Sequence, residues 1–505
     1  MSLELKGITK TFGSFTANDS IDLKVETGQI HAILGENGAG KSTLMNIVYG
    51  LLKADSGEIL IDGKKVEISE PSDALNVGIG MVHQHFMLIP VFTVAENIML
   101  GHEKSNKFRV LDLDQARAAI RTISEDFGLQ VDPDAIVETL PVGIQQKVEI
   151  IKALIYEAKV LILDEPTAVL TPQETDELLN TMRDLKSKGT SIIFITHKLR
   201  EVRAVADQIT IIRRGKVIGA VSPSTSEAEL ASMMVGRAVD LAPAKYQHET
   251  GGPILEVKNL TVRDALGTSI VKGVNFHVNS GEVLAVAGVQ GNGQSELARA
   301  LINLEEHIEG SILLDGKEIR GSSIKQSLHA GIAFIPESRE LDGVIGSFSI
   351  AENLILDLHG QAPYSKGLNL SAKVVHSEAE KRVTEFDIRT QSIMDSVSTL
   401  SGGNKQKVVI ARELSRPIKV LVASQPTRGL DVGSIEFVHE RILAQRDAGR
   451  GVILFSTELD EVMALADRIA VMYRGEILDI VGSNVTREEL GLLMAGITSA
   501  KAGAK

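Results

Sequence analysis

The chain alternates short apolar runs with segments of helical spacing. Residues 29–34 predict a short strand that leads into a glycine-rich loop. The apolar runs at 160–163 and 192–195 predict fully buried parallel strands. Beyond the loop, apolar positions follow the i, i+3, i+4, i+7 spacing of a helix with one buried face: Leu44, Ile47, Val48 and Leu51. Strands that alternate with helices predict an α/β sheet fold.

The same pattern occurs twice. The glycine-rich segment at 35–42 recurs at 288–295, and the segment 164–167 recurs at 424–427. The helical spacing also recurs, at Leu297, Ala300, Leu301 and Leu304. A period of about 255 residues is too long for a solenoid repeat and indicates two homologous domains in tandem. We place these domains at 1–240 and 253–494, with a linker at 241–252 and a flexible tail at 495–505.

The first glycine-rich segment predicts a phosphate-binding loop. Gly35 and Gly40 precede Lys41 and Ser42 in the pattern Gly-x-x-x-x-Gly-Lys-Ser, between a predicted strand and a predicted helix. The glycines let backbone N–H groups turn toward a polyphosphate, and the helix N-terminus adds a favourable dipole. In this arrangement Lys41 neutralises phosphate charge and Ser42 holds Mg²⁺.

Two carboxylates follow the apolar run at 160–163. Asp164 stands where it would hold Mg²⁺ through water, and Glu165 stands where it would polarise an attacking water molecule. Alone, this pattern also fits a solvated strand end. Its position after a phosphate loop favours the chemical interpretation.

Composition limits the partners. The chain has 505 residues, 53 Lys and Arg against 66 Asp and Glu, and a net charge of −13, which disfavours a nucleic-acid partner. The absence of cysteine excludes disulfides, Cys-zinc sites and thiol catalysis. Residues 1–6 do not begin a secretion signal, and no apolar run is long enough to span a bilayer. We therefore expect a cytoplasmic chain that contacts the membrane only through a partner.

The order of motifs resembles that of ATP-binding cassette (ABC) ATPases. A phosphate loop, Gln84, a helix start at 140–147, the segment 164–167 and His197 follow one another in the family's order. In the second copy, residues 400–407 resemble the family signature. The resemblance implies two cassettes, each with a mainly parallel sheet core, an antiparallel β part and a helical subdomain. It also implies that the cassettes close head-to-tail on ATP and Mg²⁺, so that the phosphate loop of one cassette faces the signature of the other.

The resemblance also assigns roles to residues of the first site. Lys41, Gln84, Glu165 and His197 would be catalytic, and the metal would be held by Ser42, Gln84 and Asp164. Phe12 would stack on adenine, with Phe15 as a rival. The nucleotide would contact Gly35, Glu36, Asn37, Gly38, Ala39, Gly40, Lys41, Ser42 and Thr43 in the first copy, and Ser401, Gly402, Gly403 and Asn404 in the second.

The second site departs from the family pattern. Proline at 141 replaces the signature serine and cannot donate a hydroxyl, and Thr171 replaces the loop aspartate that the other half keeps as Asp431. Other family positions are occupied by Gln294, Glu337, Ser424, Gln425 and Thr457, although Ser295 remains. We expect one hydrolytic site and one regulatory or structural site. The alternative is a second copy that only dimerises and keeps an empty site.

Fused cassettes with a degenerate second site resemble the importers of ribose-type monosaccharides and nucleosides. Within that group, residues 81–88 resemble the nucleoside-uptake subgroup. This resemblance implies two membrane-spanning permease subunits, an extracytoplasmic solute-binding lipoprotein and a location at the cytoplasmic face of the membrane. Import of ribose- or galactose-type sugars or of other small solutes stays open. A soluble twin-cassette ATPase that acts on ribosomes or DNA is the distant alternative, disfavoured by the short join and the negative charge.

Overall fold

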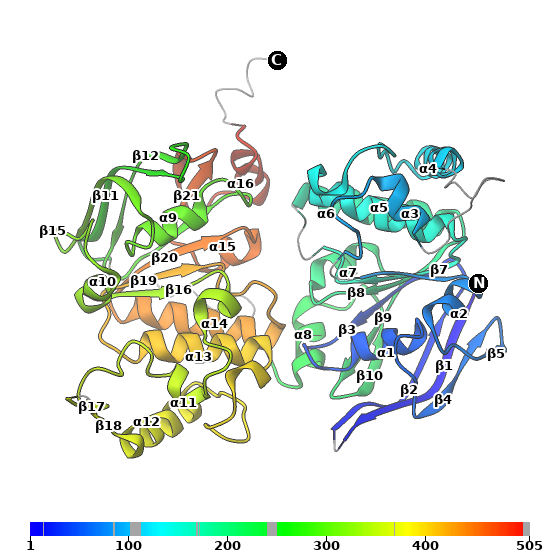
Figure 1. Cartoon of the computed structure of the whole chain (residues 1–505), viewed down its shortest axis with the longest axis horizontal. Coiled ribbons are helices and arrows are strands. Elements are labelled where there is room, and N and C mark those ends of the chain that lie inside the picture. Colours follow the sequence, from blue (N-terminus) through cyan, green and yellow to red (C-terminus); the bar gives the residue numbers. More distant parts are fainter. Residues whose placement is uncertain are drawn as a thin grey trace. The chain divides into compact units, whose positions relative to one another are not determined.

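The computed structural model describes residues 1–13, 15–83, 86–100, 113–167, 170, 172–239, 250–367 and 369–497. Contacts divide the chain into two compact units, Met1–Val239 (unit 1) and a second that holds the described residues 250–497 (unit 2). In Figure 1 unit 1 runs from blue to green and unit 2 from green to red. Most of the expected linker, 241–249, and most of the expected tail, 498–505, lie outside the described residues.

Unit 1 contains two sheets. The six-stranded sheet has the order β10-β9-β3-β8-β7-β6, and all neighbours run parallel except β9 and β10. Its strands are β3 (Ile30–Leu34), β6 (Ile79–Val82), β7 (Val160–Asp164), β8 (Ser191–Ile195), β9 (Gln208–Arg213) and β10 (Lys216–Val221). The antiparallel sheet has the order β2-β1-β4-β5, with β1 (Leu3–Phe12), β2 (Phe15–Val25), β4 (Ser56–Ile61) and β5 (Lys64–Val66).

Helices cover the faces of the six-stranded sheet (Figure 1). Helix α1 (Lys41–Val48) packs its apolar face into a core shared by both sheets of unit 1, because those side chains meet apolar residues from β1, β3, β7 and β8. The other helices of unit 1 are α2 (Pro71–Asn76), α3 (Val94–Met99), α4 (Leu113–Phe127), η1 (Val137–Thr139), α5 (Val142–Ile155), α6 (Pro172–Ser187), α7 (Leu199–Val205) and α8 (Glu227–Val235).

Two predicted strands are confirmed, and one predicted helix is too long. The runs at 160–163 and 192–195 are fully buried parallel strands, β7 and β8. The helix predicted to reach Leu51 ends at Val48, because Gly50 takes the left-handed conformation with a φ of 82°. Leu51 is therefore 49% exposed and is not on the buried face. Its counterpart Leu304 likewise lies beyond its helix and is 42% exposed.

Unit 2 repeats the architecture. Its six-stranded sheet has the order β22-β21-β13-β20-β19-β16, with β13 (Val283–Ala287), β16 (Ile332–Ile335), β19 (Val420–Ser424), β20 (Gly451–Ser456), β21 (Arg468–Tyr473) and β22 (Glu476–Gly482). Its antiparallel sheet contains β11 (Pro253–Arg263), β12 (Ser269–Asn279), β14 (His307–Leu314) and β15 (Lys317–Glu318). The predicted fold, two α/β units each with a mainly parallel sheet and an antiparallel β part, is confirmed.

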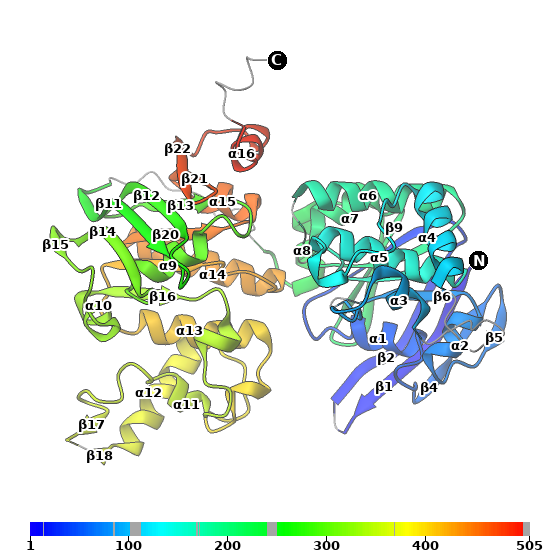
Figure 2. The same ribbon diagram turned by 45° about the horizontal axis from the view of Figure 1, so that its top comes forward.

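Unit 2 also contains a short hairpin, β17 (Ser365–Lys366) and β18 (Asn369–Leu370), which lies next to α12 at one end of the unit (Figure 2). The helices are α9 (Gln294–Ala300), α10 (Ile324–Ala330), η2 (Arg339–Gly343), α11 (Ile350–Asn353), α12 (Ala372–Glu385), η3 (Val397–Thr399), α13 (Gly402–Leu414), α14 (Val432–Asp447), α15 (Leu459–Leu465) and α16 (Arg487–Met494).

Both faces of the unit 2 sheet are buried. Along β13, Val283, Ala285 and Ala287 pack into one apolar cluster, and Leu284 and Val286 pack into another on the opposite face. A strand buried on both faces is typical of parallel sheets with helices on each side. Among the helices that the structure describes, none is long and apolar enough to cross a membrane.

Candidate functional site

The first glycine-rich loop joins β3 to α1 and leaves room only for glycine at two positions. A Cβ atom on Gly35 would lie 2.3 Å from the carbonyl oxygen of Ile212, and one on Gly40 would lie 2.2 Å from that of Ala17. Gly40 also has a φ of 103°, a conformation that L side chains rarely adopt. The sequence therefore produces the tight backbone curve that a phosphate loop requires.

Lys41 is buried at the base of this loop. Its Nζ donates hydrogen bonds to the carbonyl oxygens of Gly35, at 2.8 Å, and of Glu36, at 3.0 Å. The ammonium group thus holds the loop curved and places a positive charge at the loop. Of the other predicted loop contacts, Asn37 and Gly38 are exposed, Ala39 is buried and Thr43 is half-buried.

Ser42 and Asp164 form an oxygen pair between the loop and the end of β7. The Ser42 hydroxyl hydrogen-bonds the Asp164 carboxyl. Burial, and after it the charge of Glu165, raises the pKa of Asp164, while Ser42 and Lys41 oppose that shift. An exposed hydroxyl, that of Ser42, beside a buried carboxylate is a donor set that fits Mg²⁺, because a dication would offset the buried negative charge.

Glu165 and His197 meet at the carboxyl end of the sheet. His197 Nδ1 lies 3.2 Å from Glu165 Oε1, and both side chains are 12% exposed. Burial pushes the pKa of Glu165 upward, but the hydrogen bond and charge of His197, with Lys41 and Lys198, outweigh it and hold the pKa below its ordinary value. The carboxyl is therefore ionised at neutral pH and can accept a proton.

Lys198 joins the two segments that carry these groups, and sequence reasoning missed it. Its Nζ donates to the carbonyl oxygen of Thr167 at 3.3 Å and lies 3.7 Å from Glu201 Oε1. The Thr167 hydroxyl donates to Glu201 Oε2 at 2.7 Å. The lysine next to His197 was the available signal, but the partner on the other loop is not visible in sequence.

Two aromatic residues, Phe12 and Phe15, are the candidates for stacking on adenine. Phe12 and Phe15 pair across the β1–β2 hairpin and are 48% and 59% exposed. Lys10 Nζ lies 5.7 Å from the centroid of the Phe12 ring. Either ring could stack on adenine, so this alternative stays open. Gln84 lies outside the described residues.

The second signature begins helix α13. Ser401 caps the helix, and its Oγ accepts hydrogen bonds from Asn404 N at 3.4 Å and Asn404 Nδ2 at 3.0 Å. A Cβ on Gly403 would lie 2.2 Å from Ser434 Oγ, so the helix start lies directly against α14. Asp431 caps α14 and accepts from Ser434 N at 2.8 Å.

The first signature, at the start of α5, lacks the serine cap and has a carboxylate beside its glycine. Pro141 caps α5 without any side-chain hydrogen bond. A Cβ on Gly143 would lie 2.4 Å from Glu174 Oε1, where unit 2 has the Ser434 hydroxyl against Gly403. A carboxylate at this position disfavours a phosphate anion. Thr171 lies outside the described residues.

The second glycine-rich loop is uncharged at the lysine position. Gln294 is 5% exposed, and its Nε2 has no hydrogen-bond partner among the residues that the structure describes. Ser424 is buried at the end of β19, in the place of Asp164. Gln425 Oε1 accepts from Thr457, from Oγ1 at 3.3 Å and from N at 3.4 Å. At these four positions unit 2 therefore has uncharged side chains.

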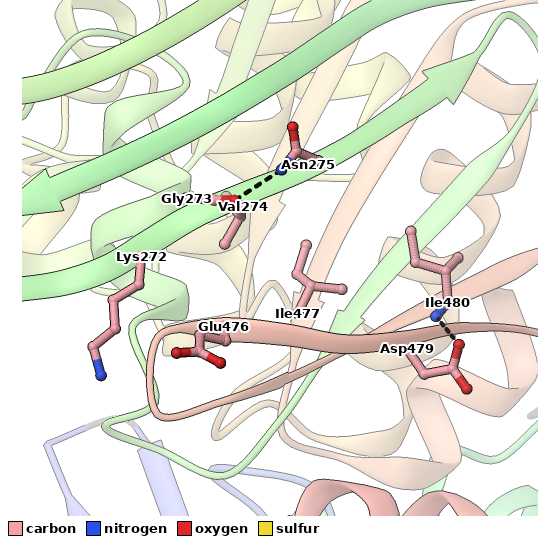
Figure 3. A pocket seen from close by; sticks show the side chains of 8 residues that line it. All are labelled: Lys272, Gly273, Val274, Asn275, Glu476, Ile477, Asp479 and Ile480. Carbon is pink, nitrogen blue, oxygen red and sulfur yellow. Dashed lines mark hydrogen bonds between the residues drawn. The ribbon is translucent and has the colours of Figure 1, made fainter.

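A pocket elsewhere in unit 2 contains none of the predicted site residues. It lies between β12 and β22 (Figure 3). Lys272 Nζ donates to the carbonyl oxygen of Arg474, Asn275 Nδ2 to that of Gly273, and Asp479 accepts from Ile480 N, each at 2.8 Å. These polar atoms are bonded to the backbone around the pocket, so they offer no convergent set for a ligand.

Comparison with known proteins decides the family. The family model for ABC transporters matches residues 18–168 and 271–428. The chain belongs to the ABC transporter family. In this family ATP is hydrolysed with Mg²⁺ as cofactor, and the two stretches matched by the model correspond to the two cassettes of the repeat.

Three curated members of the ABC transporter family are similar over nearly the whole chain. The nucleoside import ATP-binding protein NupA of Lactococcus lactis is 47% identical, covering 98% of each chain. The guanosine import ATP-binding protein NupO of Bacillus subtilis is 46% identical, covering 99% of this chain and 98% of that one. The glucose import ATP-binding protein TsgD13 of Haloferax volcanii is 43% identical, covering 98% and 96%.

Proposed function

We propose that this ABC ATPase powers nucleoside import by hydrolysing ATP at one composite site. The observation that carries the proposal is the set of chemical groups that unit 1 brings together: Lys41, Ser42, Asp164, Glu165 and His197 lie around one glycine-rich loop. The composite site joins this set to Ser401, Gly402, Gly403 and Asn404 of unit 2.

Glu165 acts as the general base. Its ionised carboxylate takes a proton from the water that attacks the γ-phosphate, and the bond to His197 fixes its direction. Lys41 stabilises the negative charge that develops on the phosphate oxygens. When bound, Mg²⁺ would supply further charge neutralisation, and Ser42, Asp164 and Gln84 are the residues that would hold it.

Unit 2 contributes the signature to this site. The capped N-terminus of α13 directs its dipole and the Ser401 hydroxyl at the γ-phosphate. Asp431 lies beside it at the start of α14. This role explains why unit 2 keeps its signature although its own loop has lost the lysine and the base.

The second composite site does not hydrolyse ATP. Gln425 cannot take a proton from water, and Thr457, which contacts it, stands where unit 1 has His197, the residue expected to hold the γ-phosphate. Loss of a general base alone costs about 10²–10⁴ in rate. Pro141 and the Glu174 carboxylate beside Gly143 add an unfavourable signature.

The chain works at the cytoplasmic face of the membrane with two permease subunits and an extracytoplasmic solute-binding lipoprotein. Residues 241–252 link the two cassettes. The segments around Gln84 and Glu337 contact the permease, so that closing and opening of the cassettes alternate its access. Contact with the membrane comes only through the permease.

Nucleosides are the proposed solute. The segment 81–88 supports this choice, as do relatives named for nucleoside and guanosine import at 47% and 46% identity. Sugar import is the second candidate, because a relative named for glucose import is 43% identical.

The test is reconstitution of the chain with the permease subunits encoded beside it in proteoliposomes. We expect guanosine, presented by the solute-binding lipoprotein, to stimulate ATP hydrolysis and to accumulate with ATP. Ribose and glucose at the same concentration should do neither. Stimulation by a sugar and not by nucleosides would contradict the proposed solute while leaving the ATPase site intact.

A further inference from the structure

The second glycine-rich loop keeps the shape of a phosphate loop. Gly291 and Gly293 have φ values of 87° and 99°, against 80° and 103° for Gly38 and Gly40 in the first loop. A Cβ on Gly288 would lie 2.5 Å from the carbonyl oxygen of Met472, which matches the close approach at Gly35. Successive glycines in these conformations make a concave row of N–H donors that binds anions.

The side-chain oxygen atoms near this loop do not form a set of ligands that fits Mg²⁺. Ser295 donates its hydroxyl to Glu337 Oε2 at 2.6 Å. The other carboxylate oxygen, Glu337 Oε1, pairs with Arg428 at 2.5 Å. Ser424 supplies a hydroxyl where the first unit has the carboxylate of Asp164. The one carboxylate at the loop is thus neutralised by an arginine, and a dication there would be repelled by the guanidinium.

Nitrogen donors take the place of the metal and the lysine. Arg428 is held by the carboxylate that also binds Ser295, so its guanidinium lies one side chain away from the loop. Arg339 supports it by donating from NH1 to the Arg428 carbonyl oxygen at 2.8 Å. Gln294 Nε2 would lie 2.9 Å from a Cβ on Gly288, at the base of the loop, and it is buried with no partner in the described part of the chain.

An unpartnered buried amide donor points to a missing acceptor. A buried N–H without a partner costs about 1–3 kcal/mol, and an anion in the loop would remove that cost. No aromatic residue occurs at 264–268, the hairpin that corresponds to the region of Phe12 and Phe15. Unit 2 therefore lacks the counterpart of the proposed adenine stack, and the loop offers its donors to the phosphate chain.

We propose that the second glycine-rich loop binds the phosphate chain of a nucleotide without a divalent cation, using Gln294 and Arg428 where the first loop uses Lys41 and Mg²⁺. The site lacks a general base and so does not hydrolyse the nucleotide, and we therefore assign it a regulatory role. It stands on contacts within unit 2, so it does not depend on hydrolysis at the first site.

The test is equilibrium dialysis of the full chain with a labelled non-hydrolysable ATP analogue, in Mg²⁺ and in excess EDTA. We expect about two bound molecules per chain with Mg²⁺ and about one with EDTA. Inorganic tripolyphosphate should displace the EDTA-resistant molecule. Complete loss of binding in EDTA would overturn the proposal, and so would displacement by ATP but not by tripolyphosphate.

Substitutions show which unit binds the ATP analogue that remains bound in EDTA. Gln294→Glu, which adds a negative charge, and Arg428→Met should each weaken it at least about tenfold, while Arg428→Lys should retain most of the affinity. Arg320→Met, at an exposed arginine whose guanidinium reaches the carbonyl oxygen of Ile308, is the matched control and should change nothing. EDTA-resistant binding that survives both Gln294→Glu and Arg428→Met would belong elsewhere and would overturn the proposal.

The two failures are distinguishable. Asp164→Asn should remove the metal-dependent molecule and leave the EDTA-resistant one. Thermal unfolding of each variant, measured without nucleotide, separates loss of binding from loss of fold. The pair Glu337→Gln with Arg428→Met provides a second route, because removing both charges should restore part of the affinity that Arg428→Met loses.

Discussion

At the scale of single residues, the difference between the two units is one of charge at shared positions. Glu165 and Gln425 have the same left-handed φ of 46°. The side chain of each one forms a hydrogen bond with a residue of the loop after the next strand: Glu165 with His197, and Gln425 with Thr457. The backbone conformation at this position is therefore the same with and without the carboxylate. Asp164 and Ser424 differ in the same way. The fold does not require acidic residues at these positions, because unit 2 forms the same strand end without them. The carboxylates of Asp164 and Glu165 are therefore better explained by chemistry at the site than by folding.

The pH dependence of hydrolysis should report the contact between His197 and Glu165. The pKa of Glu165 lies below its ordinary value, so the carboxylate is ionised above that pKa and activity falls as the pH drops through it. In His197→Asn burial continues to raise the pKa and the opposing histidine is gone, so the acidic limb of the kcat profile should move to higher pH.

The measurement is the ATPase rate between pH 4 and 8, compared with wild type. The rate at neutral pH should also fall about 10²–10³-fold, as for loss of one preorganised contact. A variant that is slower but keeps its acidic limb unchanged would show that His197 does not set the protonation of Glu165.

At the scale of elements, the two signature helices differ in the residue that begins them. Helix α13 begins at a serine cap and α5 at a proline cap, and both helices form. The difference therefore lies in the donor presented to a nucleotide and not in helix formation. The neighbouring side chain differs as well, Ser434 against Gly403 but Glu174 against Gly143.

Exchanging the caps should separate these effects. Ser401→Pro should keep α13 but remove the hydroxyl, so turnover should fall about 10²-fold while the cap loss costs about 1 kcal/mol of stability. Pro141→Ser is the matched change and should not raise turnover. ATPase assays and thermal unfolding measure both, and a rate gain in Pro141→Ser would contradict a silent second site.

Lys198 links the loop after β7 to the loop after β8, and unit 2 has Glu458 at the matching position. Lys198→Met should loosen His197 and remove a charge that lowers the pKa of Glu165, so kcat should fall about tenfold with little change in KM. Lys198→Arg should restore most of the rate. Equal losses in both variants would indicate that Lys198 serves the fold alone.

Individual strands and helices also show which features can be predicted from the sequence and which cannot. Unbroken apolar runs identified β7 and β8, because burial on both faces leaves no polar position. Spacing alone extended α1 to Leu51, because it does not register that Gly50 takes a left-handed turn. The Glu337–Arg428 pair could not be predicted, since the two residues are far apart in sequence and meet only through the fold.

At the scale of the whole molecule, the chain combines one unit that carries the proposed catalytic groups with a second unit that has uncharged residues at most of the same positions. Each unit has its own apolar core, and the six-stranded sheets of the two units have the same strand order. In the proposed function, the signature is what unit 2 contributes to hydrolysis. The central claim is that only the carboxylate of unit 1 supports hydrolysis.

The most direct test exchanges the two shared positions in the reconstituted transporter and measures ATP turnover. Glu165→Gln should lower turnover by about 10²–10⁴-fold, as expected for loss of a general base, and Lys41→Ala should do the same. Gln425→Glu, the reciprocal change at the same backbone conformation, should leave turnover within about 2-fold of wild type. Turnover that survives Glu165→Gln, or that rises severalfold in Gln425→Glu, would contradict the account.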